Sequence, residues 1–171
     1  MADRPIVLYG DPVLREIAKP VEEIDQSVKN LVENLKATLQ KAKGLGLAAP
    51  QIGESKRIFI VDLSAIDLTE SARVFINPEI IEETGEVLLE EGCLSFPGIY
   101  QKIVRAEKIK VKALDIDGKE FILEANGMLA RAIQHEFDHL EGKLFIDYLS
   151  SISLVLLKGK LSKLKKMAEA S

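Results

Sequence analysis

The sequence predicts a domain that mixes helices with short strands around one buried helix. Its 171 residues are 47% hydrophobic, which suffices to bury one good core. Short runs rich in β-branched residues occur between positions 57 and 123, as strands require. Residues 127–141 carry apolar or histidine side chains over more than half of a helical circumference, which is typical of a helix covered by other elements.

Composition and charge exclude several classes of protein. A net charge of −4 and a pI near 5.4 offer no positive footprint for nucleic acid or an anionic membrane. The first eight residues lack the apolar core of a signal peptide, and no run approaches the ~18 apolar residues of a membrane span. The single cysteine cannot form an intramolecular disulfide, which fits a reducing compartment. We therefore expect residues 1–171 to form one soluble cytoplasmic domain.

Two helices are expected in the first quarter of the chain. Asp11 and Pro12 resemble an N-cap followed by a proline at the first helical position, so a short helix begins there and Pro20 ends it. A second, amphipathic helix follows Asp25 and ends at Gly44. Its apolar positions keep helical spacing; they are Val28, Leu31, Val32, Leu35, Leu39 and Ala42.

Residues 44–53, with the sequence GLGLAAPQIG, follow no regular pattern. Three glycines and a proline in ten residues indicate a backbone held close to another group. A phosphate-binding loop is excluded, because no G-K-[ST] follows and the glycine spacing does not match a dinucleotide site. Taken alone, the segment is best interpreted as a tight connection packed against the core.

Short strands are expected in the middle of the chain. Residues 57–63 and 74–80 are β-branched runs, and the polar residues 67–72 between them form a loop. Residues 86–90 are a further candidate strand, which leads into the segment EGCLSFPG.

The last third of the chain predicts a hairpin and a terminal helix. Between 108 and 113, Ile, Val and Ala alternate with lysines, which indicates a half-buried strand whose lysine face is solvated. Asp117 and Gly118 form a hairpin turn into residues 121–123. The tail, at about 151–169, is expected to be a helix that packs on the domain surface.

The central helix carries the pattern H-E-x-x-H at His135, Glu136 and His139. Residues i and i+4 lie on one face of a helix, so both imidazoles can bind one divalent metal ion. Glu136 would then lie beside the ion as a general base for water. The chain has only two histidines, and two placed at random would stand four apart in about 1% of arrangements. A metal site is therefore favoured over two unrelated histidines.

This helix is expected to begin after Asn126 as N-cap and to end before Gly142 as C′ residue. Projected at about 100° per residue, an apolar stripe comprises Leu129, Ile133, Phe137 and Leu140. An adjoining stripe comprises Met128, Ala132, His135 and His139. The remaining side holds Arg131, Gln134, Asp138 and Glu141.

A catalytic metal of this type needs a third protein ligand and an open position for water. Two metallopeptidase patterns do not fit, because position 145 is not histidine and only Glu169 follows Glu141 as a downstream glutamate. Cys93 is the strongest remaining soft ligand, in a loop flanked by glycine and proline. A free cysteine is usually a small buried hydrophobe, but a two-histidine site without its third ligand favours Cys93 as that ligand.

Gln51 acquires a role if such a site exists. Hydrolysis at a carbonyl places negative charge on oxygen, which a side-chain amide and a backbone N–H can stabilise. The sequence alone does not place Gln51 near the metal.

Three segments together resemble the motifs of the peptide deformylase family: GLGLAAPQIG, EGCLSFPG and QHEFDHLEG, in this order. The resemblance covers roughly residues 4–150, and the motifs match without departure. It implies an α+β fold in which antiparallel sheets surround the central motif helix, followed by the C-terminal helix. It also implies removal of the formyl group from the N-terminal formylmethionine of new bacterial polypeptides, with release of formate.

The resemblance implies a role for each matching residue. The metal ligands would be Cys93, His135 and His139, and the ion would be Fe²⁺, often replaced by Zn²⁺ or Ni²⁺ in preparations. Glu136 would be the general base and acid, and Gln51 with the Leu94 backbone N–H would stabilise the oxyanion. Gly46 and Glu91 would contact the peptide or brace the site.

The substrate groove can also be sketched from the motif helix. Met128, Ala132 and Ile133 are candidate walls of an apolar pocket for the methionine. Tyr100 and Arg131, with Met128 and Ala132, are candidates for shaping the substrate groove. N-formylmethionyl nascent polypeptides are the expected partners. Proximity to the ribosome stays open, and no nucleic acid or membrane contact is expected.

The same residues allow three rival functions. A zinc metallopeptidase would cut unformylated peptides, but it predicts a third His or Glu ligand that the sequence lacks. A non-catalytic metal site would need a fourth protein ligand, and no second cysteine or third histidine exists to provide it. The third alternative is an inactive relative of the deformylases, and against it every motif residue expected to act is present.

Overall fold

The computed structural model describes residues 2–170, so Met1 and Ser171, the ends of the predicted domain, lie outside the described residues. The elements, in order, are η1 Pro12–Arg15, α1 Gln26–Ala42, β1 Gly46–Ala48, η2 Ala49–Ile52, β2 Ile58–Val61, β3 Arg73–Thr84, β4 Val87–Gly92, β5 Tyr100–Arg105, β6 Lys108–Leu114, β7 Glu120–Asn126, α2 Gly127–Leu140, η3 Phe145–Tyr148 and α3 Ser151–Glu169. The η elements are single turns of 3-10 helix.

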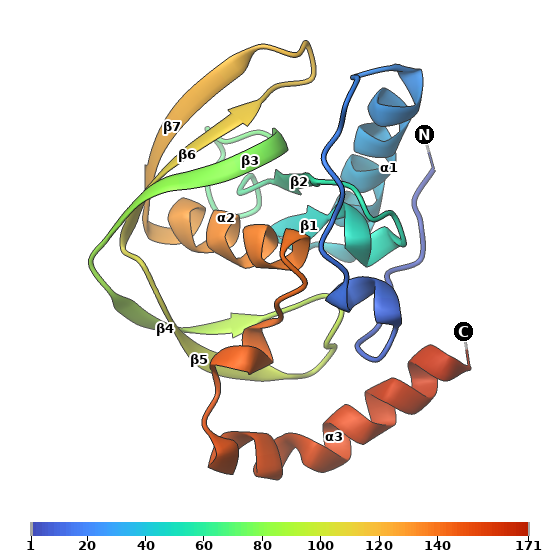
Figure 1. The fold of residues 1–171 in the computed structure, drawn as a ribbon. Helices are drawn as coiled ribbons and strands as arrows, with labels where there is room; N and C mark the ends of the chain where they lie inside the picture. The colour runs from blue at the N-terminus through green and yellow to red at the C-terminus, as the bar shows by residue number, and fades with distance from the viewer. Residues whose placement is uncertain (1, 171) are drawn as a thin grey trace.

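Two antiparallel sheets enclose the motif helix. The larger has the strand order β1-β2-β3-β6-β7, and β4 pairs with β5 in a separate ribbon. Figure 1 shows α2 between the long strands of the larger sheet and the β4–β5 ribbon, with α1 beside β1 and β2 and α3 along the opposite end. The predicted α+β fold, with antiparallel sheets around a central helix and a C-terminal helix, is confirmed.

Apolar packing fixes α2 against the larger sheet. Ile133 and Leu140 of α2 join one buried cluster with Phe59, Phe75 and Val111 from the strands. The Phe59 and Phe75 rings stack with centroids 4.8 Å apart. α1 covers a second cluster on β1 and β2 with the apolar face that its spacing predicted.

The N-terminal helices begin where expected but end differently. Asp11 caps η1 by accepting a hydrogen bond from the Val13 N–H. The turn ends at Arg15, well before Pro20, because Glu16 is already extended. α1 is capped by Asp25, and Lys43, rather than Gly44, adopts the left-handed conformation at its end, with φ of 60°.

The segment 44–53 is more regular than predicted. Three of its residues form β1, which pairs with β2 in the register Gly46↔Val61, and the next four form η2. Such short elements leave no periodicity to detect, because neither completes two repeats.

The predicted strands form, with corrected ends and one addition. β3 extends beyond residue 80 to Thr84, because β6 pairs with that stretch. β5 was not predicted: its inward positions are Ile103 and Arg105, and a buried arginine hides the alternation of apolar and polar residues.

The β6–β7 hairpin forms as predicted, with Gly118 in the left-handed region at φ of 81°. The lysine row of β6 lies at the surface, where Lys110 Nζ lies 3.4 Å from Glu82 and 3.6 Å from Glu124. These exposed pairs are worth little individually. They support the interpretation of a solvated face rather than a binding patch.

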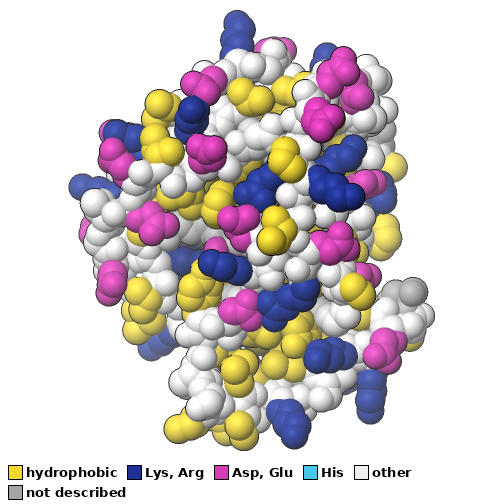
Figure 2. Space-filling view, viewed as in Figure 1, with side chains coloured by type: hydrophobic (Ala, Val, Ile, Leu, Met, Phe, Trp, Pro, Cys, Tyr) yellow, Lys and Arg dark blue, Asp and Glu magenta, His cyan; other side chains and the backbone are white. Residues whose placement is uncertain are grey.

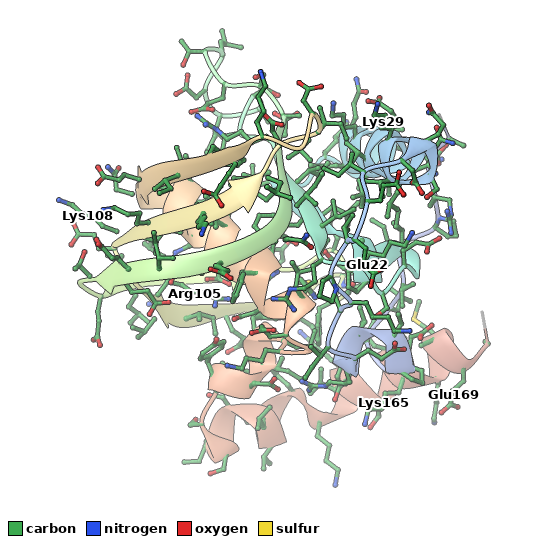
Figure 3. All side chains as sticks on the ribbon, turned by 45° about the horizontal axis from the view of Figure 1, so that its top comes forward. Glu22, Lys29, Arg105, Lys108, Lys165 and Glu169 are labelled. Carbon is green, nitrogen blue, oxygen red and sulfur yellow. The ribbon has the colours of Figure 1, made fainter. Side chains whose placement is uncertain are left out.

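α3 packs on the surface of the molecule at the predicted residues. Its buried side comprises Leu157, Leu161 and Leu164. Lys165, labelled in Figure 3, lies with its Nζ 5.3 Å from the centre of the Tyr9 ring, and a Cβ on Gly10 would come within 2.9 Å of its Cα. Gly10 therefore lets the helix approach the N-terminal segment closely.

The outer surface mixes charges of both signs. Figure 2 shows basic and acidic side chains interspersed over one face, on which neither histidine is visible. Within residues 2–170, no helix combines the length and apolarity needed to cross a bilayer.

Candidate metal centre

α2 presents the motif from inside the protein. It begins after Asn126, and Gly142 follows its end with φ of 71°, both as predicted. The side expected to face away from the apolar stripes is also covered: Arg131, Gln134 and Asp138 are at most 9% exposed. Charged hydrogen bonds from this side to the β4–β5 ribbon explain how polar residues can be buried there.

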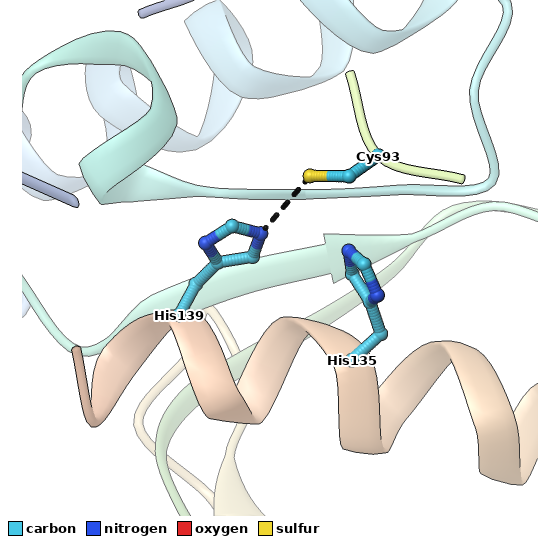
Figure 4. Close-up of side chains that lie close together, drawn as sticks. All are labelled: Cys93, His135 and His139. Atoms are coloured by element: carbon cyan, nitrogen blue, oxygen red, sulfur yellow. Dashed lines mark hydrogen bonds between the residues drawn. The ribbon is translucent and has the colours of Figure 1, made fainter. Parts of the chain in front are cut away.

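Cys93 and the two histidines converge. One donor atom from each lies within 4.8 Å of the others, and Cys93 Sγ is 3.5 Å from His139 Nε2. Figure 4 shows His135 and His139 projecting from the same side of α2 toward Cys93, which arrives on a separate segment just after β4. The prediction that Cys93 lies together with His135 and His139 is confirmed.

The spacing of these donors fits a metal ion. Metal–sulfur and metal–nitrogen bonds of about 2.3 and 2.1 Å in a tetrahedron place the two donors about 3.6 Å apart. The observed Sγ–Nε2 distance of 3.5 Å agrees with that value. A thiolate and two imidazoles suit Zn²⁺, Fe²⁺ or Ni²⁺.

Glu91 orients His135. Its Oε1 accepts from His135 Nδ1 at 2.9 Å, and Arg105 donates to both carboxylate oxygens at 2.8 and 2.9 Å. Arg131 donates to Oε2. Burial would raise the pKa of Glu91, but the hydrogen bonds from Arg105 and His135 outweigh it and lower that pKa to about 2. The carboxylate is thus ionised and accepts only, so His135 donates through Nδ1 and its Nε2 is free for a metal.

The two histidines have different electrostatic surroundings. Burial acts to lower the pKa of His135, but hydrogen bonds with Cys93 and Glu91 outweigh it and raise that pKa. Burial and the neighbouring His135 lower the pKa of His139, which favours its neutral, metal-binding form. His139 Nδ1 is buried without a hydrogen-bond partner among the described residues.

Glu136 lies beside the donors without binding to them. It is 4% exposed, and its Oε1 has no hydrogen-bond partner in the described part of the chain. Burial raises the pKa of Glu136 to about 7. A Cβ added to Gly46 would lie 2.6 Å from Glu136 Oε2, so only glycine lets β1 pass this close to the carboxylate.

Gln51 is brought to the site by η2. Its Nε2 donates to Ser95 Oγ at 3.1 Å and lies 3.6 Å from Cys93 Sγ, while its Oε1 accepts from the Ala48 N–H. The amide is therefore held in one orientation. Ser95 was not identified from the sequence, although it stands two residues after Cys93 in the same motif.

A cavity of about 510 Å³ opens beside the donors. Every predicted groove residue lines it except Ile133, which is fully buried in the core behind α2. The expectation for Ile133 is wrong because its stripe faces the larger sheet. The cavity wall includes Gly46, Gln51, Glu91, Leu94, Tyr100, Met128, Arg131 and Ala132, and also Phe96 and Pro97, which the sequence did not suggest.

Comparisons with known proteins agree over nearly the whole chain. The family model described as polypeptide deformylase matches residues 3–154. A peptide deformylase of Chromobacterium violaceum is 48% identical over 97% of this chain and 98% of its own, and peptide deformylase 1 of Clostridium perfringens is 54% identical over 86% and 99%.

Solved structures are similar as well. A peptide deformylase from Legionella pneumophila, 45% identical, superposes with a TM-score of 0.90 over 99% of both chains. The peptide deformylase from Thermus thermophilus, 42% identical, gives 0.89 over 96% of this chain and 99% of that one. With the cysteine and two histidines gathered beside an open cavity, these likenesses show that the chain belongs to the polypeptide deformylase family.

Proposed function

We propose that this deformylase hydrolyses the formyl group of N-terminal formylmethionine on newly made polypeptides, with Glu136 as its proton carrier. The observation that supports the proposal is the position of Glu136, which is buried and lines the same cavity as the metal donors Cys93 and His135. A divalent ion held by the three donors supplies Lewis-acid activation of water and of the formyl oxygen.

Glu136 has the properties of a base that must also act as an acid. A pKa of about 7 lets its carboxylate accept a proton from the attacking water near neutral pH. As the new C–O bond forms and the C–N bond breaks, the same carboxyl returns the proton to the departing amine nitrogen. Formate and a free methionine amine are the products.

Gln51 and Leu94 are the proposed oxyanion donors. The Gln51 amide is fixed by Ala48 and Ser95, so its orientation needs no reorganisation during the reaction. Leu94 follows Cys93 directly in the chain and lines the same cavity, which supports its backbone N–H as the second donor.

The remaining site residues divide into walls and braces. Met128 and Ala132 are proposed as apolar walls for the methionine side chain, since both line the cavity. The lack of a side chain at Gly46 sets the width of the cavity beside Glu136. For Glu91 we favour bracing over peptide contact, because its oxygens are occupied by two arginines and a histidine.

Fe²⁺ is the proposed native ion, with Zn²⁺ or Ni²⁺ as substitutes, and the cytoplasm near the ribosome is the proposed location. The soft thiolate and imidazole donors support these ions over Mg²⁺ or Ca²⁺. A free cysteine ligand supports a reducing compartment. Metal analysis of anaerobically purified protein tests the first point.

The activity is tested with three peptides at one metal loading: formyl-Met-Ala, acetyl-Met-Ala and Met-Ala. We expect formate release from the first and far slower turnover of the second, because an added methyl must fit into a rigid site, at a cost of ~1–3 kcal/mol. Comparable turnover of the acetylated or free peptide would favour a peptidase instead.

A further inference from the structure

Asp138 stands between the two histidines in the motif, yet it takes no part in the site described above. Its side chain is 13% exposed and lies on the side of α2 that faces the β4–β5 ribbon. Its Oδ2 accepts two hydrogen bonds, from Arg105 Nη1 at 2.6 Å and from Tyr148 Oη at 2.7 Å. Burying a carboxylate costs free energy unless hydrogen-bond donors compensate, and Asp138 has two such donors, a guanidinium and a hydroxyl. An arrangement of this kind calls for an explanation.

Arg105 connects Asp138 to the metal centre. This arginine lies on β5 and is labelled in Figure 3; its guanidinium bonds Asp138 on one side and both oxygens of Glu91 on the other. Glu91 in turn accepts from His135 Nδ1. An unbroken chain of hydrogen bonds therefore runs from Tyr148 through Asp138, Arg105 and Glu91 to the metal ligand.

The geometry leaves Arg105 little freedom. Its side chain is 4% exposed, its guanidinium makes three hydrogen bonds, and its Cζ lies 4.9 Å from the centre of the Tyr148 ring. The planar guanidinium bonds both oxygens of the Glu91 carboxylate and so fixes its orientation. The contacts that hold the Arg105 guanidinium therefore also determine the position of the Glu91 oxygen that accepts from His135.

Asp138 supplies a second buried carboxylate beside two buried guanidiniums. Arg105 and Arg131 carry two positive charges, and Glu91 and Asp138 carry two negative ones. Asp138 bonds Nη1 of Arg105, while Nε and Nη2 of the same guanidinium bond Glu91. Without the Asp138 carboxylate, Arg105 would lose its hydrogen bond on the side opposite Glu91, and the guanidinium that aligns Glu91 with His135 would be held less firmly.

We propose that Asp138 and Tyr148 are positioning residues for the metal ligand His135, acting through Arg105 and Glu91. Tyr148 is the outer end of the chain: its ring is half exposed on η3, three residues before α3 begins. The inference concerns metal binding itself and depends on the three-donor site rather than on the reaction.

The test compares Asp138→Asn and Tyr148→Phe with Asp147→Asn as a matched control. Asp147 lies on η3, bonds Arg15 at 2.7 and 3.0 Å and accepts from the Leu144 N–H, but it has no link to Glu91. At Asp147 the same chemical change removes an ion pair with Arg15 that is not part of the hydrogen-bond chain to His135. Each metal-free protein is loaded with Zn²⁺ to measure the rate of ion loss to a chelator. It is loaded with Co²⁺ to record the thiolate-to-cobalt absorption.

Asp138→Asn is expected to speed Zn²⁺ loss about tenfold and to shift the Co²⁺ spectrum, because loss of a ligand's supporting partner typically costs 10–100-fold in affinity. Tyr148→Phe should act in the same direction, by about threefold. The Asp147→Asn protein should be less stable to heat but keep the wild-type ion loss and spectrum. In the Asp138→Asn background, adding Tyr148→Phe should have almost no further effect, since both act along one chain.

Wild-type Zn²⁺ loss and Co²⁺ spectrum in both Asp138→Asn and Tyr148→Phe would overturn the proposal, and so would equal effects of Asp138→Asn and Asp147→Asn. If Asp138→Asn does not fold, the Tyr148→Phe protein decides alone, because it loses only a hydroxyl. A wild-type protein that bound neither ion would overturn the proposed function as well, whereas the outcomes above overturn this inference alone.

Discussion

At the scale of single residues, the centre depends on close approaches that only small side chains permit. Gly46 lies so close to the Glu136 carboxylate that a Cβ at this position would clash with it. A Cβ at Gly44 would likewise clash with the Leu94 side chain. Glu136 is in turn buried without a partner for one oxygen among the described residues, which raises its pKa. Reactivity here follows from exclusion of water as much as from the identity of the ligands.

Replacing Glu136 by Gln should abolish turnover by several orders of magnitude while leaving the metal content near that of the wild type. The amide keeps the size of the side chain but cannot accept the proton of the attacking water. Metal content by elemental analysis and kcat on formyl-Met-Ala check both halves. Loss of the metal together with the activity would mean that Glu136 serves as a ligand.

Replacing Gly46 by Ala should lower kcat about 100-fold. The new methyl must displace the Glu136 carboxylate, and a displacement of about 1 Å of a reacting group can cost that much. Gly159→Ala is the control, because a Cβ there meets nothing within 4 Å and the residue lies inside α3. That protein should keep wild-type kcat and gain about 0.5–1 kcal/mol of stability. Equal kcat values for the two variants would refute the steric argument.

At the scale of elements, the β4–β5 ribbon is attached to α2 by buried charges. Arg131 donates to Glu91 and to the backbone carbonyls of Val87 and Ile103, so it joins both strands of the ribbon to the helix. The sequence placed Arg131 on the polar side of α2, and polar residues suggest solvent. That is why the burial of this helix face escaped prediction, just as the buried Arg105 hid β5.

Helices and strands long enough to repeat their apolar positions were predictable from the sequence. So were the residues that can bind a metal. α1, α3 and β6 repeat their apolar positions several times, and His135, His139 and Cys93 are rare residues in this chain. β1 and η2 are too short to show a period. Ser95 and Asp138 lie inside the motifs, but their partners come from other elements, so sequence spacing does not show what they bond.

Removing Arg131 should loosen the ribbon. We expect Arg131→Ala to lower the free energy of unfolding of the metal-free protein by about 3 kcal/mol, because it removes one charged partner of the buried Glu91 and two hydrogen bonds to backbone carbonyls. Arg73→Ala removes a partly exposed pair with Glu70 and should cost less than about 1 kcal/mol. Urea unfolding in the presence of a chelator measures both. Similar losses would show that the ribbon is held by other contacts.

At the scale of the whole molecule, the centre couples metal binding to folding and to pH. Without a metal, the fold must bury Glu136 and two histidines among charged neighbours. Glu91 and Glu136 then respond to pH in opposite ways: hydrogen bonds hold the pKa of Glu91 low, and burial holds that of Glu136 high. Ionised Glu91 stabilises the fold as pH rises above the acidic range, whereas ionisation of Glu136 destabilises the fold near neutrality.

The Glu136 contribution can be isolated by comparing metal-free wild type with metal-free Glu136→Gln between pH 4 and 8. The pKa of Glu136 is about 7 when folded against 4.5 in its ordinary surroundings, so the folded state binds the proton more tightly. The stabilisation is therefore complete below about pH 4.5 and disappears as pH rises through 7. At about 1.4 kcal/mol per pKa unit, wild type should lose about 3 kcal/mol relative to Glu136→Gln across this window. Groups common to both proteins largely cancel in the comparison. Urea unfolding at each pH gives the two curves, and curves that stay parallel would mean that Glu136 is solvated or paired in the folded protein.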